Sequence, residues 1–325
     1  MYKKTFRIVF NFLIIIALSF THFSARAQSN NSSSLKRTYT VGYMKNLFNQ
    51  VDLNDAKAAI IVWLDELVKT YHFSAGYSLK VKIYDDFKEL NKEMTQDSLA
   101  IVAMNTTDYL KNYEKTGLDP VLVPSAEGDI FAQYYMLVRK DDSYKNINDL
   151  KGTSIGILSG TNQAASTCWL DVTLAKNNIP DKTKFFKKII SENKESQLIL
   201  NLFFGQLDAC IVSKGGFSVM KELNPQVGEK LISIEISPKY LWGVVCFTKT
   251  FVNPGDRDLF YTHALKIQEL ISGKQVLSLI KVDKLQTFKY DYLNSFKDLL
   301  KEYTYFLKTK RINSYDQNQY NNRPN

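Results

Sequence analysis

Short apolar runs alternate with helix-patterned segments along this chain, and the alternation constrains its fold more than any other feature. Strand-like runs are followed by segments with helical spacing in both halves of the chain. Strands are predicted at 38–43, 79–84, 99–104, 121–124, 133–139, 154–158, 186–190, 207–212 and 231–236, with a further apolar run at 242–248. Helices are predicted from Asp55 and at 87–94, 164–176, 194–204 and 217–223. The pattern predicts an α/β fold with two parallel-type sheets.

The first predicted helix carries a continuous apolar stripe. Ala56, Ile60, Trp63 and Leu67 recur at a spacing of three to four residues, so they lie on one face of a helix. Asn54 is the expected N-cap. Trp63 is therefore predicted to be a core residue rather than a ligand contact.

A chain of 325 residues usually divides into two lobes. We predict lobe I at 37–137 plus 245–308, and lobe II at 138–244. Residues 256–308 have a helical pattern and are expected to pack on lobe I. Residues 309–325 are basic and rich in Asn and Gln, which predicts a flexible tail rather than a nucleic-acid-binding arm.

The N-terminal segment has the three parts of a secretory signal peptide. Lys3, Lys4 and Arg7 precede an apolar stretch at 8–20, and Ala25-Arg26-Ala27 is a small-x-small cleavage site. We expect cleavage after Ala27, a disordered lead-in at 28–36, and a periplasmic protein. No Cys lies near the cleavage site, so no lipoprotein anchor is predicted.

The charge of the mature chain excludes a strongly basic nucleic-acid binder. The whole chain has a net charge of +9, and removing the signal segment lowers it to +5 because four bases and no acid leave. Steering of an anionic solute is compatible with this balance. Only His72 and His263 remain after cleavage, so no metal site is predicted.

The three cysteines show no metal-ligand or CxxC spacing. Cys168, Cys210 and Cys246 each lie in an apolar run, which favours small buried side chains. A disulfide between Cys168 and Cys210 is the main alternative.

One loop has the composition of an oxyanion site. It joins a predicted strand to an apolar-striped helix, so its amides are helix-start donors without intrahelical acceptors. The helix dipole and the glycine favour close approach of an anion, although an ordinary capped turn also explains such a loop. Its residues are Ser159, Gly160, Thr161, Asn162 and Gln163.

Polar residues also end strands in the first half of the chain. Asn105 and Thr106 follow the apolar run 99–104, and Tyr43 ends the first strand. Ligands of open α/β sheets bind at the carboxyl ends of strands. These three residues are therefore the expected contacts from lobe I.

Catalytic alternatives have little support. Ser213 and Lys214 are adjacent, and neighbouring residues seldom face one another. The carboxylate pairs at 85–86 and 141–142 are more simply solvated caps. No catalytic residue and no cofactor is predicted.

Several motifs together resemble type II periplasmic solute-binding proteins, and within them the phosphate, phosphite and phosphonate binders. The resemblance spans roughly residues 38–275 and is strongest at 135–139, at Asp149-Leu150-Lys151-Gly152 and in the strand 154–158. The stretch 205–209 is similar to a further family motif, "G-x-v-D-a".

The resemblance implies an α/β fold of two lobes, each with a doubly wound mixed sheet, joined by crossing hinge strands near 133–138 and 244–248. The lobes are expected to close like a hinge on a ligand. It implies that the loop 159–163 holds an oxyanion, although this loop reads Ser-Gly-Thr-Asn-Gln where phosphonate binders usually read Ser-Thr-Ser-Gly. A His common after the next strand is also absent. Tyr135, Tyr240 and Trp242, with Tyr43, are candidate aromatic walls of the cleft, and each is equally compatible with core packing.

The resemblance implies a monomeric receptor that delivers a small anionic or polar solute to an ABC permease and catalyses nothing. A ligand-sensing module that signals to a membrane partner is the alternative hypothesis. An enzyme on the same scaffold is a third, with Glu192 and Lys194 as the residues to test first.

Overall fold

The structure is a computed structural model, which describes residues 37–48, 51–70, 77–94, 99–158, 164–251 and 253–312. By their contacts, Thr38–Ala75 and Leu79–Asn325 form one compact unit. Of the other unit only Arg37, Tyr77 and Ser78 are described. The predicted signal peptide and lead-in, and the tail beyond residue 312, lie outside the described residues.

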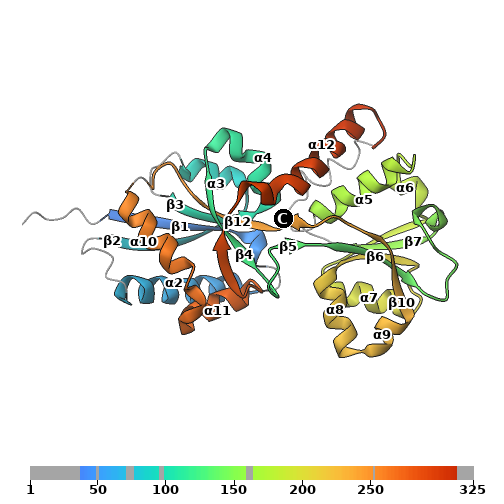
Figure 1. The fold of residues 1–325 in the computed structure, drawn as a ribbon, viewed down its shortest axis with the longest axis horizontal. Coiled ribbons are helices and arrows are strands. Elements are labelled where there is room, and N and C mark those ends of the chain that lie inside the picture. The colour runs from blue at the N-terminus through green and yellow to red at the C-terminus, as the bar shows by residue number, and fades with distance from the viewer. Residues whose placement is uncertain are drawn as a thin grey trace, which may run out of the picture. The chain divides into compact units, whose positions relative to one another are not determined.

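A six-stranded mixed sheet forms the centre of lobe I within the described residues, in the order β13-β4-β12-β3-β1-β2 (Figure 1). β1 and β3 are parallel, and β12 runs antiparallel to both β3 and β4. The strands are β1 (Arg37–Met44), β2 (Tyr77–Tyr84), β3 (Leu99–Asn105), β4 (Asp119–Ser125), β12 (Gly243–Phe247) and β13 (Lys284–Thr287).

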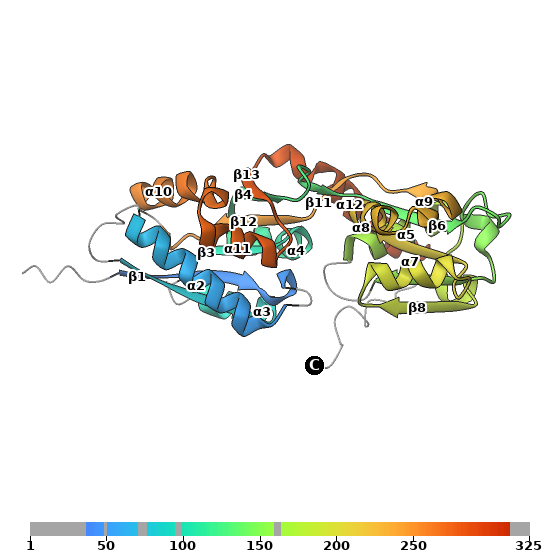
Figure 2. The same cartoon turned by 90° about the horizontal axis from the view of Figure 1, so that it is seen from below.

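Successive side chains of β3 face opposite sides of this sheet, as strand geometry requires. Ile101 belongs to a cluster with α2 (Leu53–Thr70), α10 (Pro254–Ala264) and α11 (Ile271–Leu279), whereas Val102 belongs to one with α3 (Phe87–Met94) and α4 (Thr106–Thr116). α2 and α11 pack on each other on the side of the sheet that Ile101 faces (Figures 1 and 2). Trp63 is buried there, which confirms its predicted core position.

The cap of α2 differs from the prediction. Asp52 Oδ1 accepts hydrogen bonds from the amides of Asn54 (2.8 Å) and Asp55 (3.2 Å). A carboxylate at this position meets the positive end of the helix dipole as well as the unpaired amides. Asp52 rather than Asn54 therefore caps the helix.

A five-stranded mixed sheet with the order β10-β6-β9-β7-β8 forms the centre of lobe II within the described residues. β7 is parallel to β8 and β9, while β6 is antiparallel to β9 and β10. Its strands are β6 (Tyr134–Arg139), β7 (Ser154–Leu158), β8 (Lys188–Glu192), β9 (Ala209–Ser213) and β10 (Leu231–Ile236). The helices are α5 (Ala164–Lys176), α6 (Lys182–Phe185), α7 (Glu195–Phe203), α8 (Lys214–Leu223) and α9 (Pro225–Lys230).

Two short strands run between the sheets. β5 (Phe131–Ala132) leads into β6, and β11 (Tyr240–Leu241) leads into β12; the two strands pair antiparallel. Beside them the amide of Tyr134 donates to Ser237 Oγ (2.8 Å), and the amide of Ser237 donates to the carbonyl of Tyr134 (2.9 Å). The chain therefore passes between lobes through two hydrogen-bonded segments.

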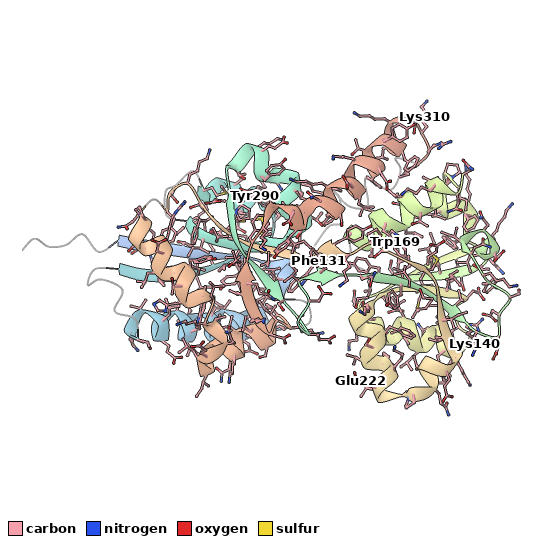
Figure 3. The ribbon with its side chains drawn as sticks, in the orientation of Figure 1. Phe131, Lys140, Trp169, Glu222, Tyr290 and Lys310 are labelled. Atoms are coloured by element: carbon pink, nitrogen blue, oxygen red, sulfur yellow. The ribbon has the colours of Figure 1, made fainter. Side chains whose placement is uncertain are left out.

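The last described helix packs differently from the expectation for residues 256–308. α12 (Asn294–Lys308) contacts α5 of lobe II (Figure 2), and Phe296 and Leu299 share a core cluster with Trp169. Trp169 lies on α5 beside α12 (Figure 3). An amphipathic helix buries its apolar face wherever a complementary surface lies within reach, and here that surface is α5. Residues 284–287 form β13 rather than helix.

The three cysteines are free in the structure, with Cys210 and Cys246 buried and Cys168 half-buried. The alternative of a Cys168 to Cys210 disulfide is therefore not supported. Among the described helices, none combines the length and the apolar character that a membrane span requires.

Candidate functional site

A cavity of about 1150 Å³ is lined by residues of both lobes. It lies where β3 ends at Asn105 and β9 ends at Ser213, and Leu158 at the end of β7 also lines it. Ligands of open α/β sheets bind at such carboxyl ends. Polar residues on its walls include Asn105, Glu127, Asp129, Gln133, Asn193, Lys194, Glu195, Ser196, Ser213, Lys214, Ser218, Lys239, Ser278, Lys281 and Asp283.

Asn105, the N-cap of α4, forms part of the lobe I wall. Asn105 caps this helix, since its Oδ1 accepts a hydrogen bond from the amide of Asp108 (2.7 Å). The amide of Thr106 donates to the carbonyl of Trp242 (3.2 Å). The buried Thr106 hydroxyl has no hydrogen-bond partner among the described residues. The positive end of a helix dipole and a polar cap therefore face the cavity region.

The lobe II wall is organised around Glu195. Its carboxylate accepts hydrogen bonds from the amide (2.6 Å) and the hydroxyl (2.9 Å) of Ser213. Ser213 is the N-cap of α8 and accepts a hydrogen bond from the amide of Gly216 (2.9 Å). The Ser213 hydroxyl is thus occupied as a structural cap, which argues against its use as a nucleophile.

The cavity walls carry both signs of charge. Lys239 Nζ lies 2.6 Å from Asp129 Oδ2. Partial burial opposes ionisation of Asp129, but the hydrogen bonds from Lys239 and from the amide of Phe131 prevail and hold its pKa below the ordinary value. The remaining charged wall residues are Glu127, Lys194, Glu195, Lys214, Lys281 and Asp283, so no single sign dominates.

The predicted lobe I residues have different surroundings. Tyr43 and Asn105 are both buried and both line the cavity, and burial raises the pKa of the Tyr43 phenol, which keeps it protonated. Thr106 follows Asn105 at the start of α4, where it is buried and is not among the residues that line the cavity. The predicted loop Ser159, Gly160, Thr161, Asn162 and Gln163 lies outside the described residues.

The aromatic candidates also differ in whether they line the cavity or lie in the core. Trp242 lines the cavity. Tyr135 instead packs against Phe217, with ring centroids 6.3 Å apart, in the core of lobe II. Tyr240 is buried against Phe296 at a centroid distance of 5.6 Å. Of the three, only Trp242 is among the cavity-lining residues.

Sequence reasoning did not select most of the charged wall residues. Glu195 lines the cavity, as do Lys194 and Lys214, which the sequence suggested only as catalytic alternatives; Glu192 is not among the lining residues. Glu195 and Ser213 are 18 positions apart in the chain, so their contact has no local signature. The pattern Ser213-Lys214-Gly215-Gly216 was the available signal, because serine before a glycine-rich helix start is typical of an N-cap.

A sequence comparison identifies the family. The profile described as "ABC transporter, phosphonate, periplasmic substrate-binding protein" matches residues 49–292, well over half of the chain. The chain belongs to this family. A phosphonate-family periplasmic substrate-binding protein captures a solute for an ABC importer, so a small solute and an ABC permease are its partners, and the family is not a class of enzymes. No functionally curated protein matches the sequence.

Solved structures of similar fold agree with this family. A binding protein component of an ABC phosphonate transporter from Pseudomonas aeruginosa is 16% identical, with a TM-score of 0.55, over 85% of this chain and 89% of that one. PhnD1 from Prochlorococcus marinus in complex with methylphosphonate is 14% identical (TM-score 0.56; 83% and 99% covered). A Xanthomonas citri protein bound to ATP is 10% identical (TM-score 0.60; 84% and 98%). The likeness confirms the predicted two-lobed periplasmic-binding-protein fold.

Proposed function

We propose that the protein binds a small oxyanion-bearing solute of the phosphonate class in the cavity described above. The observation that carries the proposal is the position of Asn105, the N-cap of α4, on the cavity wall at the carboxyl end of β3. Helix-start amides and a cap side chain are suited to an oxyanion. The PhnD1 structure contains methylphosphonate, which makes this ligand class the first to test.

The second lobe contributes the loop Ser159, Gly160, Thr161, Asn162 and Gln163 in this proposal. The loop joins β7 to α5, and Leu158, its neighbour in the chain, lines the cavity. The side chain of Asn105 and the hydroxyl of Thr106 on one side, and the hydroxyls, amides and helix-start donors of this loop on the other, would then hold one oxyanion. Lobe I would supply Tyr43, Asn105 and Thr106.

Hydrogen-bond donors rather than net charge would hold the anion. The charged cavity walls have acidic and basic side chains in similar numbers, and Lys239 is paired with Asp129. A balanced wall gives little long-range attraction, whereas oriented amides act at short range. The phenol of Tyr43, whose pKa is raised by burial, is a further hydrogen-bond donor.

The proposal extends to the compartment and the assembly. The mature protein would begin after Ala27, lie free in the periplasm without a lipid anchor, act as a monomer and catalyse no reaction. The N-terminal pattern of basic, apolar and small residues supports export. The cap role of Ser213 argues against the pair Ser213 and Lys214 as a catalytic nucleophile.

Isothermal titration calorimetry of the mature protein tests the proposal. The titrants are methylphosphonate, phosphate, sulfate and acetate, each measured at two ionic strengths. We expect methylphosphonate to bind more tightly than sulfate and acetate. Heat changes no larger than those of buffer dilution for all four titrants would refute oxyanion capture.

A further inference from the structure

Part of the six-stranded sheet is uncovered inside the molecule. Ala103 of β3 and Val245 of β12 are paired in register, and each strand has a neighbour on both sides. Residues at the centre of such a sheet are normally buried on both faces. Both residues are nevertheless only half-buried, and both line the cavity.

Five further apolar side chains surround this pair. Each is half-buried, lines the cavity and packs against the α2, α10 and α11 core of lobe I. We call the seven residues the apolar chamber: Leu47, Ala103, Trp242, Val245, Leu279, Ile280 and Leu285.

The chamber leaves apolar surface accessible where helices and sheet would otherwise close on each other. Accessible apolar surface inside a protein is unfavourable unless another apolar group covers it. An apolar ligand group that fills such a space therefore gains binding free energy, as small apolar molecules do in cavities of this kind. Methylphosphonate is too small to fill a cavity of about 1150 Å³.

The chamber adjoins the proposed oxyanion site. Asn105 lies two residues beyond Ala103 on β3, so the two side chains share a face of the sheet. Trp242, a member of the chamber, accepts the hydrogen bond from the amide of Thr106 at the start of α4. A ligand with its oxyanion at this helix start would project its organic part over Ala103 and Val245.

We infer that the ligand is an oxyanion with an apolar substituent of several carbons, which occupies the apolar chamber. The inference rests on the proposed function and narrows it from small phosphonates to longer alkyl or aryl ones. In this arrangement polar groups at the end of β3 bind the oxyanion, and the apolar chamber covers the apolar substituent.

A series of straight-chain alkylphosphonates tests the inference on the wild-type protein. Calorimetry with methyl-, propyl- and hexylphosphonate measures the change in Kd per methylene. Burial of each methylene is expected to tighten binding about fourfold while the chamber fills. The slope of binding free energy against alkyl chain length is then compared between the wild-type protein and the variants below.

A variant that fills the chamber gives a second measurement. Val245→Phe adds a ring at its centre and is expected to abolish the gain per methylene. Val121→Phe is the matched control, because Val121 is also half-buried in this sheet, on β4, but does not line the cavity. The control should retain the wild-type slope. The wild-type series remains decisive if Val245→Phe does not fold.

The outcomes separate the two hypotheses. Methylphosphonate binding with no gain, or a loss, for the propyl and hexyl compounds would overturn the chamber as a ligand site and leave the proposed function standing. Absence of binding by every alkylphosphonate would overturn both. A rising affinity that Val245→Phe removes and Val121→Phe keeps supports the inference.

Discussion

Glu195 accepts two hydrogen bonds from Ser213, one from its amide at 2.6 Å and one from its hydroxyl at 2.9 Å. The pair joins the first turn of α7 to the end of β9 and the cap of α8. It thereby holds together three elements of the lobe II cavity wall. A carboxylate that satisfies two donors in this way contributes to stability and to the shape of the cavity.

Replacing Glu195 by Ala should destabilise lobe II. The amide and hydroxyl of Ser213 lose their acceptor, and a partly buried donor without a partner is costly. We expect the free energy of unfolding to fall by about 2 kcal/mol, measured by urea denaturation. Glu222→Ala, at an exposed site on α8, is the control and should change little. Equal stability of both variants would contradict the structural role of Glu195.

Gly216 should not tolerate a side chain. A Cβ on Gly216 would collide with Oε2 of Glu195, whereas a Cβ on Gly215 would meet Glu127 and Ser213 at 3.9 and 4.0 Å, which is ordinary contact. Gly216→Ala is expected to lose about 1–3 kcal/mol of stability through overpacking. Gly215→Ala is the matched control in the same turn. Denaturant titration of the two variants should separate them; a Gly215→Ala protein as unstable as Gly216→Ala would count against this explanation.

Asn105→Asp should weaken oxyanion binding without unfolding the protein. Aspartate is as good an N-cap as asparagine, so the stability should change by less than about 1 kcal/mol. The new negative charge on the cavity wall should repel an anionic ligand and raise the Kd for methylphosphonate at least tenfold, on the order of a close charge pair. Asn224→Asp, at the cap of α9 and away from the cavity lining, is the control for calorimetry. Unchanged affinity in Asn105→Asp would place the oxyanion elsewhere.

The ion pair between Asp129 and Lys239 should make stability depend on pH in the acid range. The pKa of Asp129 is lower in the folded protein than in the unfolded chain. Its carboxylate therefore stabilises the fold above the ordinary value near 4, and the contribution is lost as pH falls through the lower folded pKa. The effect is small because the pair is partly exposed.

Urea denaturation of wild type and Asp129→Asn measures this effect. The difference in unfolding free energy should be constant from about pH 7 to pH 5 and shrink below about pH 4. A difference that is independent of pH down to about pH 3 would show that the lowered pKa makes no contribution to stability.

The thiols should be unreactive in the folded protein. Burial raises the pKa of Cys168 to about 12 and also raises the pKa values of the Cys210 and Cys246 thiols, so little thiolate forms at neutral pH. A thiol reagent at pH 8 should modify none of them within minutes, and all three after denaturation without reductant. Recovery of only one reactive thiol would indicate a disulfide instead.

Element positions followed closely from the sequence. The predicted segments 87–94, 154–158, 164–176 and 231–236 have the same bounds as α3, β7, α5 and β10. In 87–94 and 231–236 apolar residues recur with the helix and strand periods, whereas 154–158 and 164–176 are marked by a high content of apolar residues. Gly205 follows the C-cap of α7 and has a φ of 76°, as expected of a glycine that ends a helix. In contrast, α4 was not predicted, because its apolar residues are few and its cap Asn105 was interpreted as part of a loop.

The site was only partly predictable, because the local sequence does not show which side chains of a strand face the cavity. Tyr43 and Asn105 were found from the rule that ligands lie at strand ends, and both line the cavity. Tyr135 was chosen as an aromatic wall of the cleft, but it packs against Phe217 in the core of lobe II. A shift of one position along a strand reverses the face, and aromatic composition does not reveal which face meets the ligand.

The amino-acid sequence by itself determined the α/β class and the family, because apolar periodicity and motif order are local properties of the chain. The tertiary structure decided which surfaces meet: α12 lies on α5, Glu195 lies beside Ser213, and Ala103 and Val245 remain accessible at the centre of a sheet. These relationships join residues distant in the chain, and they depend on packing free energy summed over many contacts, which no local pattern encodes.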